Sequence, residues 1–235
     1  MELYNGLTEL LREAASGGRE YDYIPGDACG KAEKGSIILT KETAFELGGS
    51  ALPAVSGAMF CGSGEITDGV VLCGKDIGEL SSDAPYARFA VISLKDGADE
   101  DDDTVYTHLK NAELAKYHVY PKGCLIRLSP ESRREQLRVG KKAAAELSLK
   151  NIGFSFIEEY KKSELVEAVK IYFFTGSGFD YKKLGELADK ASAVTESLNK
   201  IMQGLAVSCD TCELKEICDE VDGLRKLHFG KEKQL

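Results

Sequence analysis

The stretch Val169-Lys-Ile-Tyr-Phe-Phe-Thr-Gly-Ser-Gly-Phe-Asp180 places a strand directly before a helix and indicates the fold class. Residues 169–174 are rich in β-branched and aromatic side chains, which favour a strand. Asp180 then supplies an N-cap for a long helix, and Gly204 supplies its stop. The apolar residues of this helix recur at helical spacing: Leu184, Leu187, Ala191, Val194, Leu198 and Ile201.

Shorter elements precede this unit along the chain. Glycine-rich segments separate β-type runs at residues 36–40, 55–60, 70–73, 88–94 and 124–128. Helical patterns occupy residues 3–12, 129–147 and 149–162. We therefore expect an α+β fold, in which a mixed or antiparallel sheet of short strands packs against helices and a C-terminal cysteine-rich metal loop follows.

The helix expected at 129–147 has the clearest start signal. Ser129-Pro130-Glu131 combines a serine N-cap, a proline at the first helical position and an early acid. It would carry one basic face, which is either a solvated surface or a docking surface for an acidic partner. That face consists of Arg133, Arg134, Arg138, Lys141 and Lys142.

These patterns divide the chain into three parts. Residues 1–35 form an N-terminal helix and loop, residues 36–205 form an α+β domain, and residues 206–235 form a cysteine-rich segment. The acidic run at residues 99–103 is interpreted as a solvated loop, because it lacks the spaced oxygen ligands and turn glycine of a calcium site.

Composition limits the functional classes. The 235 residues include 39 Asp plus Glu against 30 Lys plus Arg, which argues against nucleic acid as a partner. No apolar run approaches the roughly 18–20 residues that span a bilayer, and the N-terminus lacks the pattern of a secretory signal. We therefore expect a cytoplasmic protein. Seven cysteines, an odd number, then argue for metal binding or free thiols over a disulfide framework.

Three of these cysteines form a C-x2-C-x5-C motif in Ser208-Cys-Asp-Thr-Cys-Glu-Leu-Lys-Glu-Ile-Cys-Asp219, and His228 follows ten residues later. Two thiolates two residues apart can hold one metal centre from a single turn, and a third completes a three-point clamp. Thiolates select zinc, copper(I) or an iron–sulfur cluster. A Cys3His set also suits structural zinc, so ligand chemistry leaves both iron–sulfur and zinc open.

Other candidate residues receive simpler interpretations. Cys61, Cys73 and Cys124 adjoin strand ends and are expected to be small buried hydrophobes. The Gly176-Ser-Gly178 turn lacks the Gly-Lys-Ser/Thr of a P-loop and is expected to be an ordinary strand-to-helix turn. The remaining histidines, His108 and His118, are expected at the surface.

Several segments, in this order, resemble the beta subunit of the carbon monoxide dehydrogenase/acetyl-CoA synthase complex, the acetyl-CoA synthase itself. The similarity covers roughly residues 40 to 230 and ends in the cysteine motif. The segments are Glu46-Leu-Gly-Gly-Ser-Ala-Leu-Pro-Ala54, Gly64-Glu-Ile-Thr-Asp-Gly-Val-Val71, Gly74-Lys-Asp-Ile-Gly-Glu79, Arg127-Leu-Ser-Pro-Glu-Ser132, Leu149-Lys-Asn-Ile-Gly153 and Val169-Lys-Ile-Tyr-Phe-Phe-Thr175. In the third of them, Lys75 replaces the usual proline.

The resemblance implies that Cys209, Cys212 and Cys218 ligate a [4Fe-4S] cluster. His228 stands where the family has a fourth cysteine, and imidazole is a known substitute that raises the reduction potential. The family's Cys-Gly-Cys nickel segment and its N-terminal domain are both missing from these 235 residues. We therefore do not expect full acetyl-CoA synthesis.

The expected function is that of an iron–sulfur protein related to acetyl-CoA synthase, an accessory or truncated paralogue in anaerobic one-carbon or corrinoid metabolism. It would act through electron transfer, cluster support or binding to a carbon monoxide dehydrogenase or corrinoid protein. The alternative is a zinc-stabilised interaction module without redox or catalytic activity.

Overall fold

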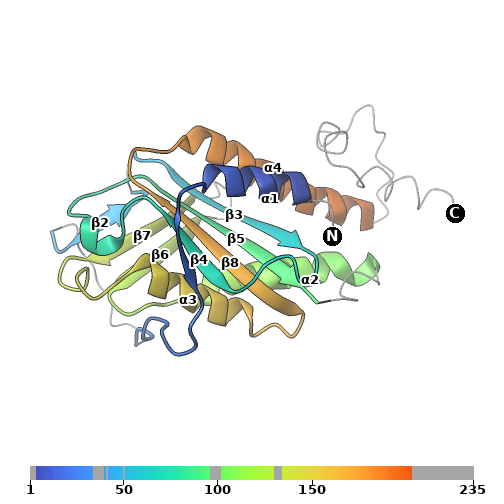
Figure 1. Cartoon of the computed structure of the whole chain (residues 1–235), viewed down its shortest axis with the longest axis horizontal. Coiled ribbons are helices and arrows are strands. Elements are labelled where there is room, and N and C mark those ends of the chain that lie inside the picture. The colour runs from blue at the N-terminus through green and yellow to red at the C-terminus, as the bar shows by residue number, and fades with distance from the viewer. Residues whose placement is uncertain are drawn as a thin grey trace, which may run out of the picture.

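The computed structural model describes residues 4–33, 40, 42–49, 51–95, 102–129 and 134–202. Two sheets and four α-helices make up this part of the chain, so the expected α+β class is confirmed (Figure 1). The helices are α1 (Asn5–Ala14), α2 (Asp102–Leu114), α3 (Leu149–Tyr160) and α4 (Tyr181–Met202). Two short 3-10 helices, η2 (Ile77–Glu79) and η3 (Ala115–His118), lie between them.

A five-stranded mixed sheet forms the centre of the fold, with the strand order β1-β4-β8-β5-β3. Its β3–β5 and β4–β8 pairs are parallel, whereas β1–β4 and β5–β8 are antiparallel. The strands are β1 (Arg19–Asp22), β3 (Ala54–Cys61), β4 (Gly69–Cys73), β5 (Tyr86–Leu94) and β8 (Val166–Thr175). The sheet is thus mixed, as the sequence predicts, and the four predicted runs at 55–60, 70–73, 88–94 and 169–174 lie within its strands.

The second sheet is antiparallel, with the order β2-β7-β6. Its strands are β2 (Ala44–Leu47), β6 (Cys124–Ser129) and β7 (Arg134–Gly140). Strand β7 contacts β3 and β5, so one face of this small sheet packs on the large one. Most of the run predicted at 36–40 lies outside the described residues.

The prediction of a helix at 129–147 is wrong. Residues 134–140 form strand β7, paired with β6 from Ser129↔Arg134 to Cys124↔Val139. Burial alternates along β7, because Glu135, Leu137 and Val139 are buried while the residues between them are partly exposed. The inward-facing charge of Glu135 hides this period-two pattern in the sequence.

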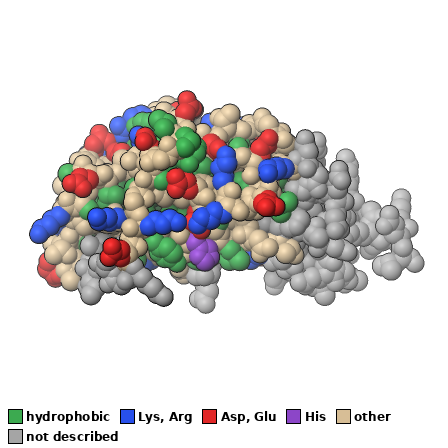
Figure 2. Space-filling model, turned by 90° about the horizontal axis from the view of Figure 1, so that it is seen from below, with side chains coloured by type: hydrophobic (Ala, Val, Ile, Leu, Met, Phe, Trp, Pro, Cys, Tyr) green, Lys and Arg blue, Asp and Glu red, His purple; other side chains and the backbone are tan. Residues whose placement is uncertain are grey.

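The predicted basic helix face is also wrong, because Arg134 and Arg138 lie on strand β7 and not on a helix. Arg138 on β7 pairs with Glu46 on β2, and Arg134 donates to the carbonyl oxygens of Gly48 and Leu52. Both guanidinium groups therefore bind the β2 strand and the loop after it. Figure 2 shows a row of Lys and Arg side chains across the face seen from below, with acidic side chains above and below it.

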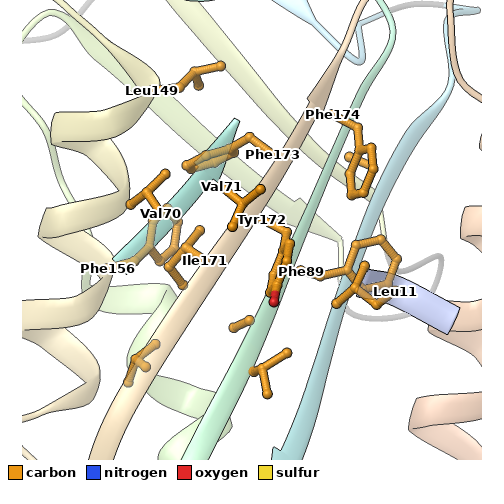
Figure 3. Close-up of a cluster of buried hydrophobic side chains, with 14 of the residues drawn as sticks. Leu11, Val70, Val71, Phe89, Leu149, Phe156, Ile171, Tyr172, Phe173 and Phe174 are labelled. Carbon is orange, nitrogen blue, oxygen red and sulfur yellow. The ribbon is translucent and has the colours of Figure 1, made fainter. Parts of the chain in front are cut away.

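The helices cover both faces of the large sheet. Helices α1 and α4 lie side by side on one face, and α3 lies on the other (Figure 1). Alternate residues of β8 serve the two layers: Ile171 and Phe173 face α3 together with Val70, whereas Tyr172 and Phe174 face the α1 side (Figure 3). Strand β8 lies at the centre of the sheet and reads as the continuous buried run typical of such a position.

Residues of the N-terminal segment belong to this same core. Tyr4, just before α1, and Leu7 and Leu11 on α1 are buried with the sheet residues. Strand β1 adds an edge strand next to β4. The helix predicted at 3–12 is confirmed as α1. Strand β1 was not predicted, because its four residues are mostly exposed and carry no apolar alternation.

Candidate metal centre and polar cavity

The predicted metal ligands, Cys209, Cys212, Cys218 and His228, lie outside the described residues, which end at Met202. The element that leads to them is α4. Its start is capped as expected, because the Lys183 amide donates to Asp180 Oδ1 at 3.1 Å. Helix α4 has 22 residues, and the cysteine-rich segment follows it in the sequence.

Helix α4 is held firmly by the core. Its apolar face buries Leu184, Leu187, Ala188, Ala191 and Val194. In the C-terminal half of α4, Thr195 Oγ1 lies 2.9 Å from Tyr4 Oη, and both residues are buried. The Tyr4 ring packs edge-on against Phe60 of β3. Tyr4, at the start of α1, thus contacts both β3 and the C-terminal half of α4.

The cysteines within the described residues are poor metal ligands. Cys61, Cys73 and Cys124 are at most 3 % exposed, which confirms their expected role as small core residues. Burial raises the pKa of Cys61 and of Cys73 to about 11 and raises that of Cys124 further. Because the thiolate is the form that binds metal, these thiols are poorly suited to ligation at neutral pH.

Burial also raises the pKa of Cys29 to about 11, although this residue is partly exposed. Across the described ranges, no three His, Cys, Asp or Glu side chains are grouped closely enough to hold a metal ion. The donor set of the C-terminal motif, three thiols and an imidazole, fits either an iron–sulfur cluster or zinc. The described part of the chain offers no competing set.

The Gly176-Ser-Gly178 segment is an ordinary turn between β8 and α4, as expected. Gly176 adopts a positive φ of 85°, and Tyr181 Oη donates to its carbonyl oxygen at 2.8 Å. His118 is exposed, also as expected, whereas the side chain of His108 is not among those described. The acidic loop expected at 99–103 is partly wrong, because Asp102 begins α2.

A buried ion pair that the sequence did not reveal joins the two sheets. Arg88 of β5 donates from Nε to Glu135 Oε1 at 2.7 Å and from Nη2 to Glu135 Oε2 at 2.5 Å. Tyr86 Oη donates to the same carboxylate at 2.9 Å, and the Phe156 ring lies 4.2 Å from Arg88 Cζ. Burial lowers the pKa of Arg88, but the Glu135 carboxylate outweighs that effect and raises it above the ordinary value.

A polar cavity lies beside the C-terminal half of α4. It has a volume of about 310 Å³ and is enclosed by β3, α2, η3, the end of β6 and α4. Lys110, Glu113 and Lys116 line one side of it. The sequence alone does not reveal this site, although the i,i+3 spacing of Lys110 and Lys116 around Glu113 hints at a charged cluster.

None of the helices in the described ranges is both long and apolar enough to cross a membrane. No protein-family model matches the chain, and a search of curated proteins finds no significant match.

Proposed function

We propose that this chain is an iron–sulfur protein related to acetyl-CoA synthase, with a [4Fe-4S] cluster held by Cys209, Cys212, Cys218 and His228. The observation that carries the proposal is the C-x2-C-x5-C motif, which follows α4 and is succeeded by a histidine. Three soft thiolates at this spacing, with a fourth donor in the same short segment, provide a complete cluster ligand set.

The geometry of the body supports this assignment in two ways. Cys61, Cys73 and Cys124 are buried, and burial raises the pKa of these thiols and of the partly exposed Cys29, so the described cysteines compete poorly with the motif for metal. Helix α4, which leads into the motif, is fixed against the sheet and α1 by a buried face and by the Tyr4–Thr195 hydrogen bond.

We propose an accessory role for this stretch of sequence. A Cys-Gly-Cys nickel segment does not occur in these 235 residues, so this stretch of sequence does not itself supply the dinickel chemistry of acetyl-CoA synthesis. We propose electron transfer, cluster support or partner binding in anaerobic one-carbon or corrinoid metabolism. The partner would be a carbon monoxide dehydrogenase or a corrinoid protein, in the cytoplasm.

A zinc-stabilised interaction module is the second candidate. His228 favours it, because a Cys3His set closing a short segment is a known structural zinc arrangement. In that case the site would have no redox activity, and the segment would serve only to bind a partner.

Anaerobic reconstitution with iron and sulfide tests the first proposal. We expect the wild type to take up iron, to gain the broad visible absorbance of a cluster and to give an EPR signal on reduction. Cys212→Ser should take up much less iron. Cys29→Ser, a partly exposed thiol outside the motif, should match the wild type. A wild-type protein that takes up no iron contradicts the proposal.

A further inference from the structure

Small residues form part of the lining of the polar cavity beside α4. They include Gly57 and Ala58 on β3 and Ala188 on α4. A Cβ on Gly57 would lie 2.7 Å from the Phe89 ring and 3.3 Å from Ala188 Cβ, so a larger residue would not fit there without movement. The cavity beside this close strand–helix contact has a volume of about 310 Å³, which is within the size range of small-ligand sites.

Two lysines and one glutamate form the charged side of the cavity. Lys116 Nζ lies 2.6 Å from Glu113 Oε1, and Lys110 Nζ lies 3.6 Å from Glu113 Oε2. The side chains of Lys116 and Glu113 are only 15 % and 26 % exposed. Each ammonium group has three N–H donors, and Glu113 occupies one side of each group, so donors remain for a second acceptor.

Hydroxyl groups line the facing walls. Ser56 comes from β3, Ser129 from the end of β6, and Ser192 and Thr195 from α4. Thr195 Oγ1 already bonds Tyr4 Oη and the Ala191 carbonyl oxygen. Hydroxyls both donate and accept hydrogen bonds, so the Ser192 hydroxyl on the same wall suits the polar body of a small ligand. Glu196 also lies in the lining and is exposed. The charged residues of the described lining are therefore two lysines and two glutamates, of which the Lys116–Glu113 pair is the most buried.

We propose that this cavity binds a small metabolite bearing one oxyanion group, a carboxylate or a phosphate. Lys116 and Lys110 hold the anion beside Glu113, and the hydroxyl of Ser192 contacts the rest of the molecule. Glu113 keeps the two ammonium groups together before the ligand arrives, which reduces the cost of ordering them on binding. The proposal is independent of the iron–sulfur assignment, because none of the predicted metal ligands takes part.

Inorganic phosphate and acetate are the probes for the test, with sodium chloride at equal ionic strength as the control. We expect saturable stabilisation against thermal unfolding by at least one of the two anions. Stabilisation by phosphate alone or by acetate alone identifies the oxyanion class. Since a charge-assisted hydrogen bond contributes about 1.5–3 kcal/mol, Lys116→Met should weaken binding by about tenfold or more.

Two further variants keep the test decisive. Lys110→Met, at a side chain that is 49 % exposed, should fold normally and also weaken binding. Lys182→Met, at an 88 % exposed lysine on α4 outside the cavity, should bind like the wild type. The proposal is overturned if neither anion gives saturable stabilisation, or if Lys110→Met and Lys182→Met bind the stabilising anion with the same affinity.

Discussion

Arg88 and Glu135 form an ion pair that is at most 1 % exposed and joins β5 of the large sheet to β7 of the small one. Three hydrogen-bond donors, two from Arg88 and one from Tyr86, converge on the Glu135 carboxylate. A buried pair of this kind contributes little net stability compared with apolar residues, but removing one partner leaves an uncompensated charge in the core. The pair therefore holds Arg88 of β5 against Glu135 of β7 where the two sheets meet.

Glu135→Gln tests this interpretation. The substitution preserves shape but leaves the Arg88 charge unpaired, so we expect the free energy of unfolding to fall by about 3–5 kcal/mol. The measurement is urea denaturation followed by circular dichroism. Glu186→Gln, in an exposed pair with Lys182, is the matched control and should change stability by less than about 0.5 kcal/mol. Similar losses in the two variants would contradict a special role for the buried pair.

Gly153 and Gly185 offer a matched pair of helix glycines. A Cβ at Gly153 of α3 would lie 2.4 Å from Val70 Cγ2 and 3.1 Å from the Phe173 ring. Gly153→Ala should therefore destabilise by about 1–3 kcal/mol despite better helix propensity. At Gly185 of α4 the described residues place no heavy atom within 4 Å of a Cβ, so Gly185→Ala should stabilise by about 0.5–1 kcal/mol. Thermal denaturation of both variants measures these changes in stability. A stabilising Gly153→Ala substitution would show that α3 packs less closely on β4 and β8 than the structure has it.

Acid stability should depend on Glu113. Burial raises its pKa, but Lys116 and Lys110 outweigh that effect and hold the pKa below the ordinary 4.5. A carboxyl whose pKa is lowered by folding adds stability above its unfolded value and loses it as the pH falls through its folded value. The stability difference between wild type and Glu113→Gln should therefore be constant near neutral pH and shrink below about pH 4.5. Urea titrations between pH 3 and 7 would measure it. A difference that stays constant throughout would argue against an ionised, paired Glu113.

Cysteine alkylation should separate the core thiols from the motif. At a pKa of about 11, as for Cys61 and Cys73, roughly one thiol in a thousand is ionised at pH 8, and burial blocks access further. We expect slow iodoacetamide labelling of these residues, whether or not metal is bound. Cys209, Cys212 and Cys218 should be protected in anaerobically prepared protein and labelled rapidly after iron is removed. Mass spectrometry of the peptides gives each rate, and equal rates for Cys73 and Cys209 after iron removal would count against the assignment.

The central β8–α4 unit was predictable because local and tertiary signals agree there. The β-prone run at 169–174 is buried on both faces, and Asp180 caps the helix that follows. The segment after Ser129 was not predictable for the opposite reason. Its residues favour a helix locally, but tertiary contacts stabilise a strand instead. These contacts are the pairing of β7 with β6 and the ion pair of Glu135 with Arg88, which is 47 residues away.

The candidate sites divide in the same way. The cysteine motif is visible from the sequence alone, because its ligands are close together along the chain. The polar cavity was not, because its walls come from β3, β6, η3 and two helices, which only the fold brings together. Sequence spacing predicts local ligand sets, and it does not predict a cavity assembled from distant elements.

The most direct test of the central claim is the elemental composition of protein purified without oxygen. Iron, acid-labile sulfide and zinc are measured per chain, in the wild type and in Cys209→Ser. We predict about four irons and four sulfides per wild-type chain, the content of a [4Fe-4S] cluster, and strong loss of both in the variant. One zinc per chain without sulfide would contradict the iron–sulfur assignment and establish the zinc-stabilised module in its place.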